Sequence, residues 1–295
     1  MTIACIGITV LDRIQRVESL PDKGGKYIAK DYFEVGGGPA ATAAVAVAKL
    51  GHAVDFIGRL GQDSVAETLL TELKQYGVNT DRTVHIHEAS SAFSVVLVDD
   101  QGERIIVNYQ DPSLSRDPTP LENIDFSRYT TILTDVRWPE GAEYALQQAK
   151  HYGIPSVLDA DMSPDPIDSL VKLADHVAFS EPGLEKFTGC ADPIEGLKIA
   201  QKQTSGKVYV TVGSQGCYWL ENQELCHEPV IKVDVVDTTG AGDVFHGALA
   251  VAVAEAKQSR ESIVFSNTVA ALKCTKRGGR EGIPTRVEVD QKLQK

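Results

Sequence analysis

Residues 237–243 read Asp-Thr-Thr-Gly-Ala-Gly-Asp, and Val-Phe-His-Gly-Ala follows at once. The string lies between a strand-like run at 230–236 and a run of helical composition at 242–256. Gly240, Ala241 and Gly242 let the backbone turn tightly with exposed N–H groups, and a helix that starts there adds partial positive charge. The pattern predicts an anion hole between a strand and a helix, suited to a phosphoryl group in transfer.

Asp243 closes this string. At a helix start we expect its carboxylate to stay ionised and to accept a proton from a substrate hydroxyl. Phosphoryl transfer needs mainly positioning and charge neutralisation, so few catalytic side chains are expected. An ordinary glycine-rich turn with Asp243 as a first-turn acid is the alternative, but the full string is more specific than a lone G-x-G.

Strand-like and helix-like segments alternate outward from this turn. The predicted strands lie at 3–7, 54–57, 131–133, 156–158, 177–179 and 208–212. The predicted helices lie at 40–50, from the N-cap Asp63 to Gly77, and at 140–152, 193–203, 242–256 and 262–274. Such alternation is typical of an α/β fold with a mainly parallel sheet sandwiched by helices.

Two segments, 27–35 and 92–109, lack a crossover helix. The second reads as a hairpin that turns at Asp99–Gly102. We expect both to pair into a small antiparallel sheet that covers the active site as a lid. The sequence indicates one domain over 1–295, with lid strands inserted from about 12–35 and 90–112.

Composition narrows the class of protein. The 295 residues carry a formal net charge of −12, which disfavours nucleic acid and anionic membranes as partners. An anionic substrate would need a local basic pocket. Five widely spaced cysteines without a C-x-x-C pair fit reduced thiols, and no leader or membrane span is evident, so we expect a soluble cytoplasmic protein.

Other nucleotide and hydrolase motifs are missing from the sequence. It has no G-x-G-x-x-G after a strand with an acid ~20 residues later, no G-x-x-x-x-G-K-[ST] and no G-x-S-x-G. Dinucleotide oxidoreductases and P-loop NTPases are therefore disfavoured. A non-catalytic sugar or nucleotide sensor stays open, although sensing does not require the base Asp243.

The 237–243 string resembles the C-terminal signature of the PfkB-type, or ribokinase-like, carbohydrate kinases. Residues 36–44, Gly-Gly-Gly-Pro-Ala-Ala-Thr-Ala-Ala, resemble the family's N-terminal glycine motif, and 210–216 resemble its nucleotide-side strand and turn. The three matches occur in the family's order and span the chain. The resemblance implies a ribokinase-like fold and ATP-dependent sugar phosphorylation with Mg²⁺.

The resemblance also implies residue roles. Asp243 would be the base, with Gly240, Ala241 and Gly242 as the anion hole. Asp12 would bind sugar hydroxyls, and Gly37 and Gly38 would let the sugar approach the backbone. The residues expected to border ATP are Thr211, Gly213, Gly216, Asn267 and Gly279. Asp237 and Thr239 would help to hold a monovalent cation such as K⁺.

Two positions depart from the family pattern. Thr42 stands where many members have Asn, which puts that sugar contact in doubt. Ser180-Glu-Pro-Gly183 replaces an N-x-x-E stretch near the metal, and Glu181 is the residue that could substitute in part. Metal handling is expected to differ in detail.

Three polar residues suggest what the sugar carries at its far end: Lys26, Asn108 and Arg137. Each has an ordinary alternative, namely a solvated loop charge, the end of a strand, or a surface ion pair. Together, two cations and an amide suit a tetrahedral anion such as a phosphate or sulfonate.

Longer strings, among them GITVLDRI, GERIIVNY and AFSEPGLEKFTG, resemble the 6-deoxy-6-sulfofructose kinases of bacterial sulfoglycolysis. That resemblance implies a sulfonate held by Lys26, Asn108 and Arg137, and a product phosphorylated at the 1-hydroxyl. Fructose 6-phosphate, tagatose 6-phosphate or a neutral ketose remain alternative substrates. The resemblance to the PfkB-type family also implies a homodimer in which the lid strands of two subunits pair.

Overall fold

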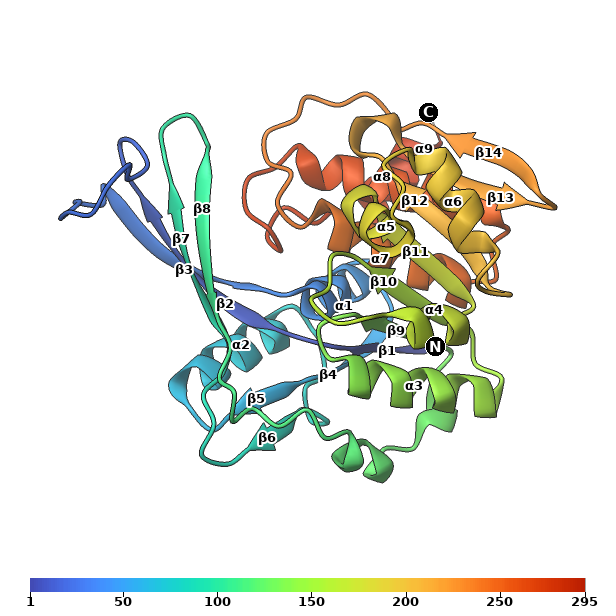
Figure 1. Ribbon diagram of the computed structural model, residues 1–295, viewed down its shortest axis with the longest axis horizontal. Coiled ribbons are helices and arrows are strands. Elements are labelled where there is room, and N and C mark those ends of the chain that lie inside the picture. Colours follow the sequence, from blue (N-terminus) through green and yellow to red (C-terminus); the bar gives the residue numbers. More distant parts are fainter. Residues whose placement is uncertain (295) are drawn as a thin grey trace.

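The computed structural model describes residues 1–294, and its centre is an eight-stranded sheet in the order β14-β13-β12-β11-β10-β9-β1-β4 (Figure 1). The strands from β12 through β4 pair in parallel, whereas β13 and β14 add an antiparallel edge. Their bounds are β1 Thr2–Ile6, β4 Ala53–Ile57, β9 Thr131–Asp135, β10 Ser156–Ala160, β11 His176–Ser180, β12 Lys207–Thr211, β13 Cys217–Glu221 and β14 Glu224–Glu228.

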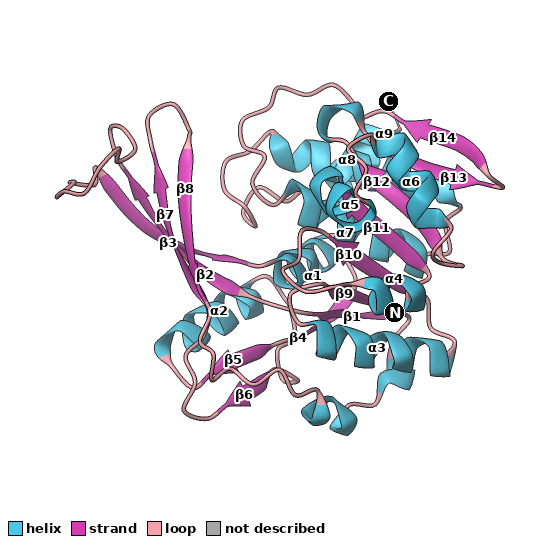
Figure 2. Ribbon diagram, in the orientation of Figure 1, coloured by secondary structure: helices cyan, strands magenta, loops and turns pink. Residues whose placement is uncertain are grey.

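Helices cover both faces of this sheet (Figure 2). They are α1 Pro39–Lys49, α2 Ser64–Gln75, α3 Pro139–Tyr152, α4 Asp168–Leu173, α5 Glu181–Thr188, α6 Pro193–Gln201, α7 Ala241–Ala254, α8 Ser259–Cys274 and α9 Arg286–Leu293. Because successive side chains of a strand point to opposite faces of the sheet, the hydrophobic core has a part on each face. Ile3 and Cys5 of β1 pack with α1, α7 and α8, whereas Ala4 and Ile6 pack with α3. The predicted α/β sandwich with a mainly parallel sheet is confirmed.

A second sheet projects from one side of the body, in the order β3-β2-β7-β8 (Figure 1). Its strands are β2 Val10–Arg16, β3 Asp31–Gly37, β7 Phe93–Val98 and β8 Arg104–Tyr109. The β2–β3 and β7–β8 pairs are antiparallel, and β2 and β7 join them in parallel. Beneath it, the short strands β5 Arg59–Gly61 and β6 Val84–Ile86 form a separate pair. We call the β3-β2-β7-β8 sheet the lid.

The segment before residues 237–243, which we call the catalytic turn after its predicted role, differs from its prediction. Residues 230–236, expected to be a strand, form an extended loop without sheet pairing. The N–H groups of Val236 and Asp237 instead donate to the Cys274 carbonyl at the end of α8, at 2.8 and 3.1 Å. Val235 and Val236 are more than half exposed, so this apolar run does not mark a buried strand.

Strands β13 and β14 and helices α4, α5 and α9 were not predicted from the sequence. The β13–β14 hairpin turns through Asn222 and Gln223, both with positive φ, and that turn lacks the glycine that signals hairpins. Within the described residues, none of the helices combines the length and the apolar character that a membrane crossing requires.

Candidate active site

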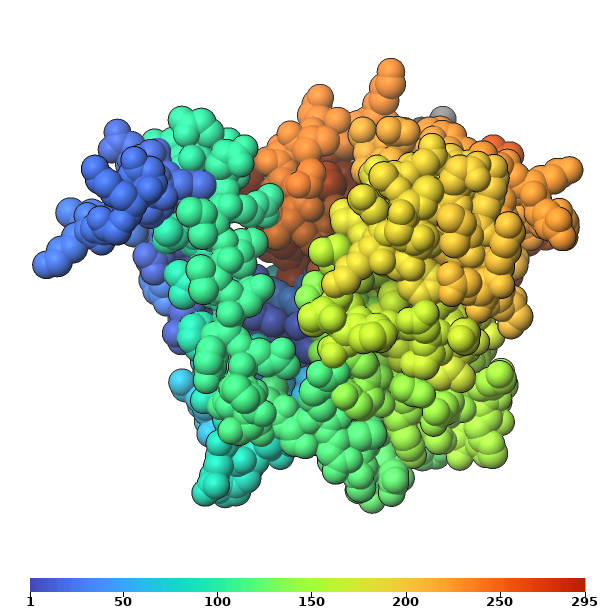
Figure 3. Space-filling model, in the orientation of Figure 1, coloured from blue at the N-terminus to red at the C-terminus, as the bar shows by residue number. Residues whose placement is uncertain are grey.

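A cleft of about 1220 Å³ separates the lid from the body of the protein (Figure 3). Its walls come from the lid strands, the start of α1, the loop at 235–240, the start of α7 and the turn at 277–279. The carboxyl edge of a parallel sheet is where α/β proteins bind ligands, because several loops converge there. The predicted catalytic turn therefore opens into the largest hollow described.

The turn adopts the geometry that its glycines predict. Gly240 is in the left-handed region at φ 73° and caps the N-terminus of α7. The Ala241 N–H donates to the Thr238 carbonyl at 3.1 Å, so it is used within the turn. At a helix start the N–H groups of Gly242 and Asp243 have no intrahelical acceptor, and a side chain added at Gly242 would meet only open space. These two N–H groups are the donors available to an anion.

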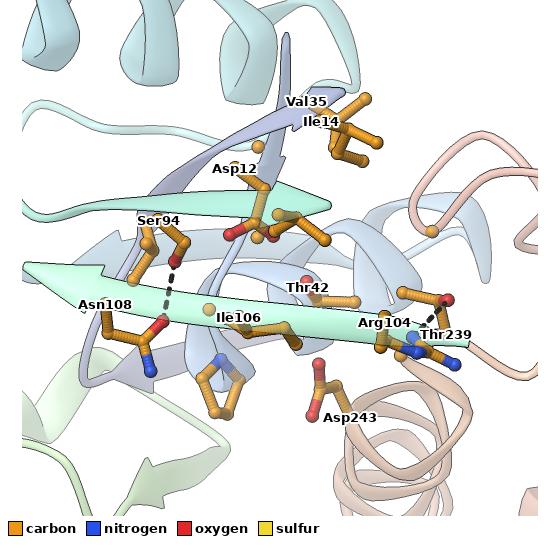
Figure 4. Close-up of a pocket in the computed structure, with 18 of the residues that line it drawn as sticks. Asp12, Ile14, Val35, Thr42, Ser94, Arg104, Ile106, Asn108, Thr239 and Asp243 are labelled. Atoms are coloured by element: carbon orange, nitrogen blue, oxygen red, sulfur yellow. Dashed lines mark hydrogen bonds between the residues drawn. The ribbon is translucent and has the colours of Figure 1, made fainter. Parts of the chain in front are cut away.

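Asp243 points into the cleft close to Thr42 of α1 (Figure 4). Burial raises the pKa of its carboxyl to about 7, and the nearby carboxylates Asp159, Asp161 and Asp135 act in the same direction. His246 opposes this rise. The prediction that the helix start keeps Asp243 ionised is therefore corrected: near neutral pH the protonated and ionised forms are both populated.

His246 lies one turn after Asp243 on α7 and is buried. Its Nε2 lies 3.1 Å from the Ala178 carbonyl and its Nδ1 lies 3.2 Å from Asp159 Oδ2. Burial lowers the pKa of His246, but Asp159 and Asp243 raise it above its ordinary value overall. Because both ring nitrogens face oxygen acceptors, the protonated imidazolium fits this position.

The predicted sugar-binding residues meet on the opposite wall. Asp12 lies on β2, and a side chain at Gly37 would come within 2.5 Å of its Oδ2. Gly38 caps α1 at φ 95°, where a side chain would clash with the Ile8 carbonyl at 2.6 Å. Thr42 is buried in the first turns of α1 and lies against Gly240. The glycine motif thus brings backbone close to Asp12 and to the catalytic turn.

Sequence reasoning missed Asp135, which holds that motif in place. From the end of β9 its buried carboxylate accepts the N–H groups of Ile8, Ala40 and Arg137 at 2.9, 3.1 and 2.9 Å. Burial raises its pKa to about 6, although these N–H groups act in the opposite direction. The sequence around Asp135 did not reveal this role, because Ile8 and Ala40 lie 127 and 95 residues away along the chain.

Arg280 was also missed. Its buried guanidinium donates to the Gly37 carbonyl at 2.6 Å and to Thr9 Oγ1 at 3.3 Å, and it pairs with Glu72 at 3.4 Å. Burial raises the pKa of Asp12, whereas its hydrogen bond with Ser94 and the charge of Arg280 lower it, with a net rise. Through its bond to the Gly37 carbonyl and its charge near Asp12, Arg280 therefore stabilises the wall of the cleft that is predicted to bind the sugar.

Two of the three predicted anion-binding residues reach the cleft. Asn108 on β8 accepts a hydrogen bond from Ser94 Oγ at 2.8 Å through Oδ1, which leaves its amide NH₂ as a donor (Figure 4). Arg137 lines the cleft with Nη2 4.0 Å from Asp161 Oδ2. Lys26 is exposed in the loop between β2 and β3 and does not line the cleft, so one chain does not bring all three together.

Seven carboxylates line the cleft, and so do six arginines: Arg16, Arg59, Arg104, Arg116, Arg137 and Arg277. Arg116 pairs with Glu140 and Asp165 at 2.9 and 3.1 Å, and Arg59 donates to two backbone carbonyls. Arg104 of the lid donates to Thr239 Oγ1 at 3.3 Å and links the lid to the catalytic turn (Figure 4). Sequence reasoning had not singled it out.

The predicted ATP-binding residues are only partly brought to the cleft. Gly279 lines it, whereas Thr211, Gly213, Gly216 and Asn267 do not. Thr211 Oγ1 donates to the Phe179 carbonyl, and the Asn267 amide donates to the Glu228 carbonyl at 3.0 Å. A side chain at Gly216 would strike that same carbonyl at 2.1 Å. Gly216 and Asn267 therefore brace the end of β14, whatever they contribute to a nucleotide.

The predicted metal residues lie apart. Asp237 and Thr239 border the cleft beside the catalytic turn, and the Thr239 N–H donates to Asp237 Oδ1 at 2.8 Å. Glu181 is the exposed first residue of α5, whose N-cap Ser180 bonds to Gly183 and Asp161. Among residues 1–294 there is no group of three or more His, Cys, Asp or Glu side chains arranged to hold a metal ion.

Known proteins resemble the whole chain. The model of the pfkB family carbohydrate kinases matches residues 1–286. Ribokinase of Bacillus subtilis is 29% identical over 99% of both chains, and fructokinase-1 of Oryza sativa subsp. japonica is 30% identical over 92% of this chain and 93% of its own. A structure provisionally assigned as a ribokinase, from Agrobacterium tumefaciens, has 34% identity, a TM-score of 0.91 and covers 99% and 97% of the two chains.

The lidded α/β sandwich, together with these matches over nearly the whole chain, identifies an ATP-dependent sugar kinase. The chain belongs to the PfkB family of carbohydrate kinases. A sugar and ATP are therefore its substrates.

Proposed function

We propose that this kinase transfers the γ-phosphoryl group of ATP to the 1-hydroxyl of 6-deoxy-6-sulfofructose, giving 6-deoxy-6-sulfofructose 1-phosphate and ADP. The observation that carries the proposal is that Asn108 and Arg137 line the same cleft as Asp12 and Asp243. Hydroxyl-binding, proton-accepting and anion-binding groups thus share one hollow. The long sequence strings that resemble sulfofructose kinases support the same substrate.

We propose that the group bound by Arg137 and Asn108 is a sulfonate rather than a phosphate. A sulfonate has one negative charge, whereas a phosphate monoester carries more at neutral pH. Arg116 is already neutralised by Glu140 and Asp165, so it offers little to a ligand. Arg137 has only a 4.0 Å contact with Asp161, and Asn108 adds a neutral donor. This guanidinium and this amide together suit a singly charged group.

In the proposed step, Asp243 accepts the proton of the 1-hydroxyl as that oxygen attacks the γ-phosphorus. The bond from the γ-phosphorus to the bridging oxygen breaks and ADP leaves. The N–H groups of Gly242 and Asp243 would stabilise the charge on the phosphoryl oxygens. Mg²⁺ bound with ATP would neutralise the phosphates, and we propose that Glu181 would help to hold it from outside the lining of the cleft.

We further propose a homodimer through the lid. Ile105, Val107 and Tyr32 lie on its outer face and are 38%, 61% and 54% exposed, which is unusual for such residues on a lone surface. A second copy that covers this face would bury them and would bring another lid loop near the cleft. A cytoplasmic setting suits the five cysteines, none of which forms a disulfide.

The substrate is tested by turnover across a panel: sulfofructose, fructose 6-phosphate, tagatose 6-phosphate, fructose and ribose. ADP release gives kcat/KM for each, and phosphorus NMR locates the new phosphate. We expect sulfofructose to give the highest kcat/KM, with the product phosphorylated at the 1-position. A higher kcat/KM for any other sugar would remove the sulfofructose assignment and leave the kinase class intact.

A neutral sugar is the second candidate, because the curated relatives include ribokinase and fructokinase. It predicts that replacing Arg137 leaves the sugar KM nearly unchanged. It also predicts that fructose or ribose outperforms both anionic ketoses in the same panel.

The role of Lys26 is tested by complementation between subunits. Lys26→Ala and Asp243→Asn chains are prepared separately, and then mixed under conditions that allow subunits to exchange. If Lys26 serves the site of the other copy, mixed dimers contain one complete site and recover activity that neither parent has. If Lys26 has no such role, the mixture shows only the average of its parents.

A further inference from the structure

Lys273, near the end of α8, is a lysine whose side chain is wholly buried, at 0% exposure. Lysine is almost never fully buried unless its charge is compensated. Its Nζ donates to the backbone carbonyl of Asp237 at 2.9 Å and lies 3.8 Å from Asp237 Oδ1. A buried ammonium therefore lies directly behind the catalytic turn.

The turn is tied to the end of α8 through several further bonds. Asp237 Oδ1 accepts the Thr239 N–H at 2.8 Å, and Oδ2 accepts the Gly278 N–H at 3.0 Å. The Cys274 carbonyl accepts the N–H groups of Val236 and Asp237. Asp237 is thus the junction between the loop that precedes α7 and the loop that follows α8.

The contact between Asp237 and Lys273 favours the charged form of each, and burial opposes both. Burial raises the pKa of Asp237, but the Thr239 and Gly278 N–H groups and the Lys273 charge lower it below its ordinary value overall. Burial lowers the pKa of Lys273 overall, and Asp237, Cys274 and Asp243 offset part of that change. The contact distances, rather than these pKa directions, place the amine against Asp237.

The residues expected to bind a monovalent cation do not fit one. K⁺ would need several oxygen ligands near Asp237 and Thr239, but each carboxylate oxygen of Asp237 already accepts an N–H group, which leaves it fewer lone pairs for an ion. The Asp237 carbonyl already accepts the Lys273 ammonium. A second cation beside this ammonium would be repelled, because like charges are poorly screened in a buried site.

We propose that the ammonium of Lys273 takes the place of a free monovalent cation behind the anion hole, so that this kinase needs no K⁺. The proposal rests on the assignment of the 237–243 turn as the phosphate-binding element. A covalently attached cation is always present, which holds Asp237 and orders the turn before nucleotide binds. It does not depend on which sugar is phosphorylated.

Three variants distinguish the effect of the Lys273 charge from the effect of its buried volume. Lys273→Met keeps most of the buried volume and removes the charge, whereas Lys273→Ala also leaves room for an ion. Lys276→Met is the matched control, because Lys276 lies two residues after α8 with its Nζ paired to exposed Glu288 at 2.6 Å. Each protein is compared in KCl and in tetramethylammonium chloride at equal ionic strength.

Binding of ADP with constant Mg²⁺ is measured by calorimetry, and Tm is measured by thermal unfolding. We expect the wild-type protein and Lys276→Met to show the same ADP Kd and the same Tm in both salts. We expect Lys273→Met and Lys273→Ala to bind ADP about tenfold more weakly in tetramethylammonium. K⁺ should restore binding to Lys273→Ala and leave Lys273→Met weak, since only the former has space for the ion.

Either of two results would overturn the proposal. One is a wild-type protein whose ADP affinity or Tm rises specifically in K⁺. The other is unchanged ADP binding in Lys273→Met, or no recovery of Lys273→Ala in K⁺. If neither variant folds, the wild-type comparison still decides the matter. Because ADP binding involves no sugar, failure of the sulfofructose assignment would leave these results unchanged.

Discussion

The two walls of the cleft differ in how they are built. On the phosphoryl side, Lys273 is wholly buried, and both carboxylate oxygens of Asp237 accept backbone N–H groups. On the lid side, every residue of β8 is exposed, and Asn108 has a single side-chain partner. A wall dense in buried bonds is organised before ligand arrives, whereas an open sheet gains its partners on binding. We therefore expect substitutions on the phosphoryl wall to lower kcat and those on the lid wall to raise the sugar KM.

The largest effect is expected at Asp243. Asp243→Asn keeps the shape of the catalytic turn and removes the proton acceptor, so kcat should fall by ~10² or more. ATP binding, measured by calorimetry, should be retained. Asp168→Asn, an exposed change at the start of α4, is the control and should leave kcat intact. Unchanged turnover in Asp243→Asn would remove its assigned role and with it the contrast between the walls.

The next effect is expected at Arg137. Losing a charge-assisted hydrogen bond costs roughly 1.5–3 kcal/mol, so Arg137→Ala should raise the KM for the sulfonated sugar about ten- to a hundredfold. The KM for ATP should change little. Steady-state kinetics with each substrate varied in turn measure both. Arg128→Ala, an arginine beside Tyr129, serves as the control, and equal changes in both KM values would contradict the anion-site assignment.

The pH dependence sharpens the description of the buried wall. Burial and neighbouring acids raise the pKa of Asp243 to about 7, and only its ionised form accepts a proton. The rate of the chemical step should therefore fall as the pH drops through about 7. Asp161→Asn removes one of the negative charges that raise this pKa, so the acidic limb should move to lower pH by roughly half a unit. A wild-type profile that is flat from pH 5.5 to 8 would contradict the raised pKa.

The smallest effect is expected on the outer face of the lid. Val107→Lys places a charge on the surface proposed to meet a second copy, so the dimer should dissociate into monomers in light-scattering measurements. The kcat should fall only a few-fold, because the phosphoryl wall is untouched, and the loss of the partner's lid loop should appear in the sugar KM. Gln147→Lys on α3 controls for added charge. A wild-type protein that is monomeric at micromolar concentration would exclude this interface.

Sequence and structure agree best where the signal is local. The helix cap at Asp63 and the turn at Gly240 were both predicted, because each depends on residues within one helical turn. The 230–236 run was wrongly predicted as a strand. Its apolar residues resemble a strand, but its backbone donors bond to the end of α8 rather than to a neighbouring strand.

The candidate site divides in the same way. The sequence placed Asp243 and Asp12 in chemical roles, and both line the cleft. It did not reveal Asp135, Arg280 or Lys273, which have no surrounding motif. Lys26 shows the opposite error, because a charge that looked suitable for the anion lies outside the cleft of its own chain.

By itself, the amino-acid sequence determined the α/β alternation, the turn at Gly240 and the aspartate beside it. These features follow from the conformational freedom of glycine, from helix capping and from the spacing of hydrophobic residues, each of which depends on only a few neighbouring residues. Only the tertiary structure decided which charges are buried together. Asp135 meets Ile8 across 127 residues, Lys273 meets Asp237 across 36, and Arg280 meets Thr9 across 271. Such pairings depend on how the chain closes around its core, because a buried charge is stable only where folding supplies a partner.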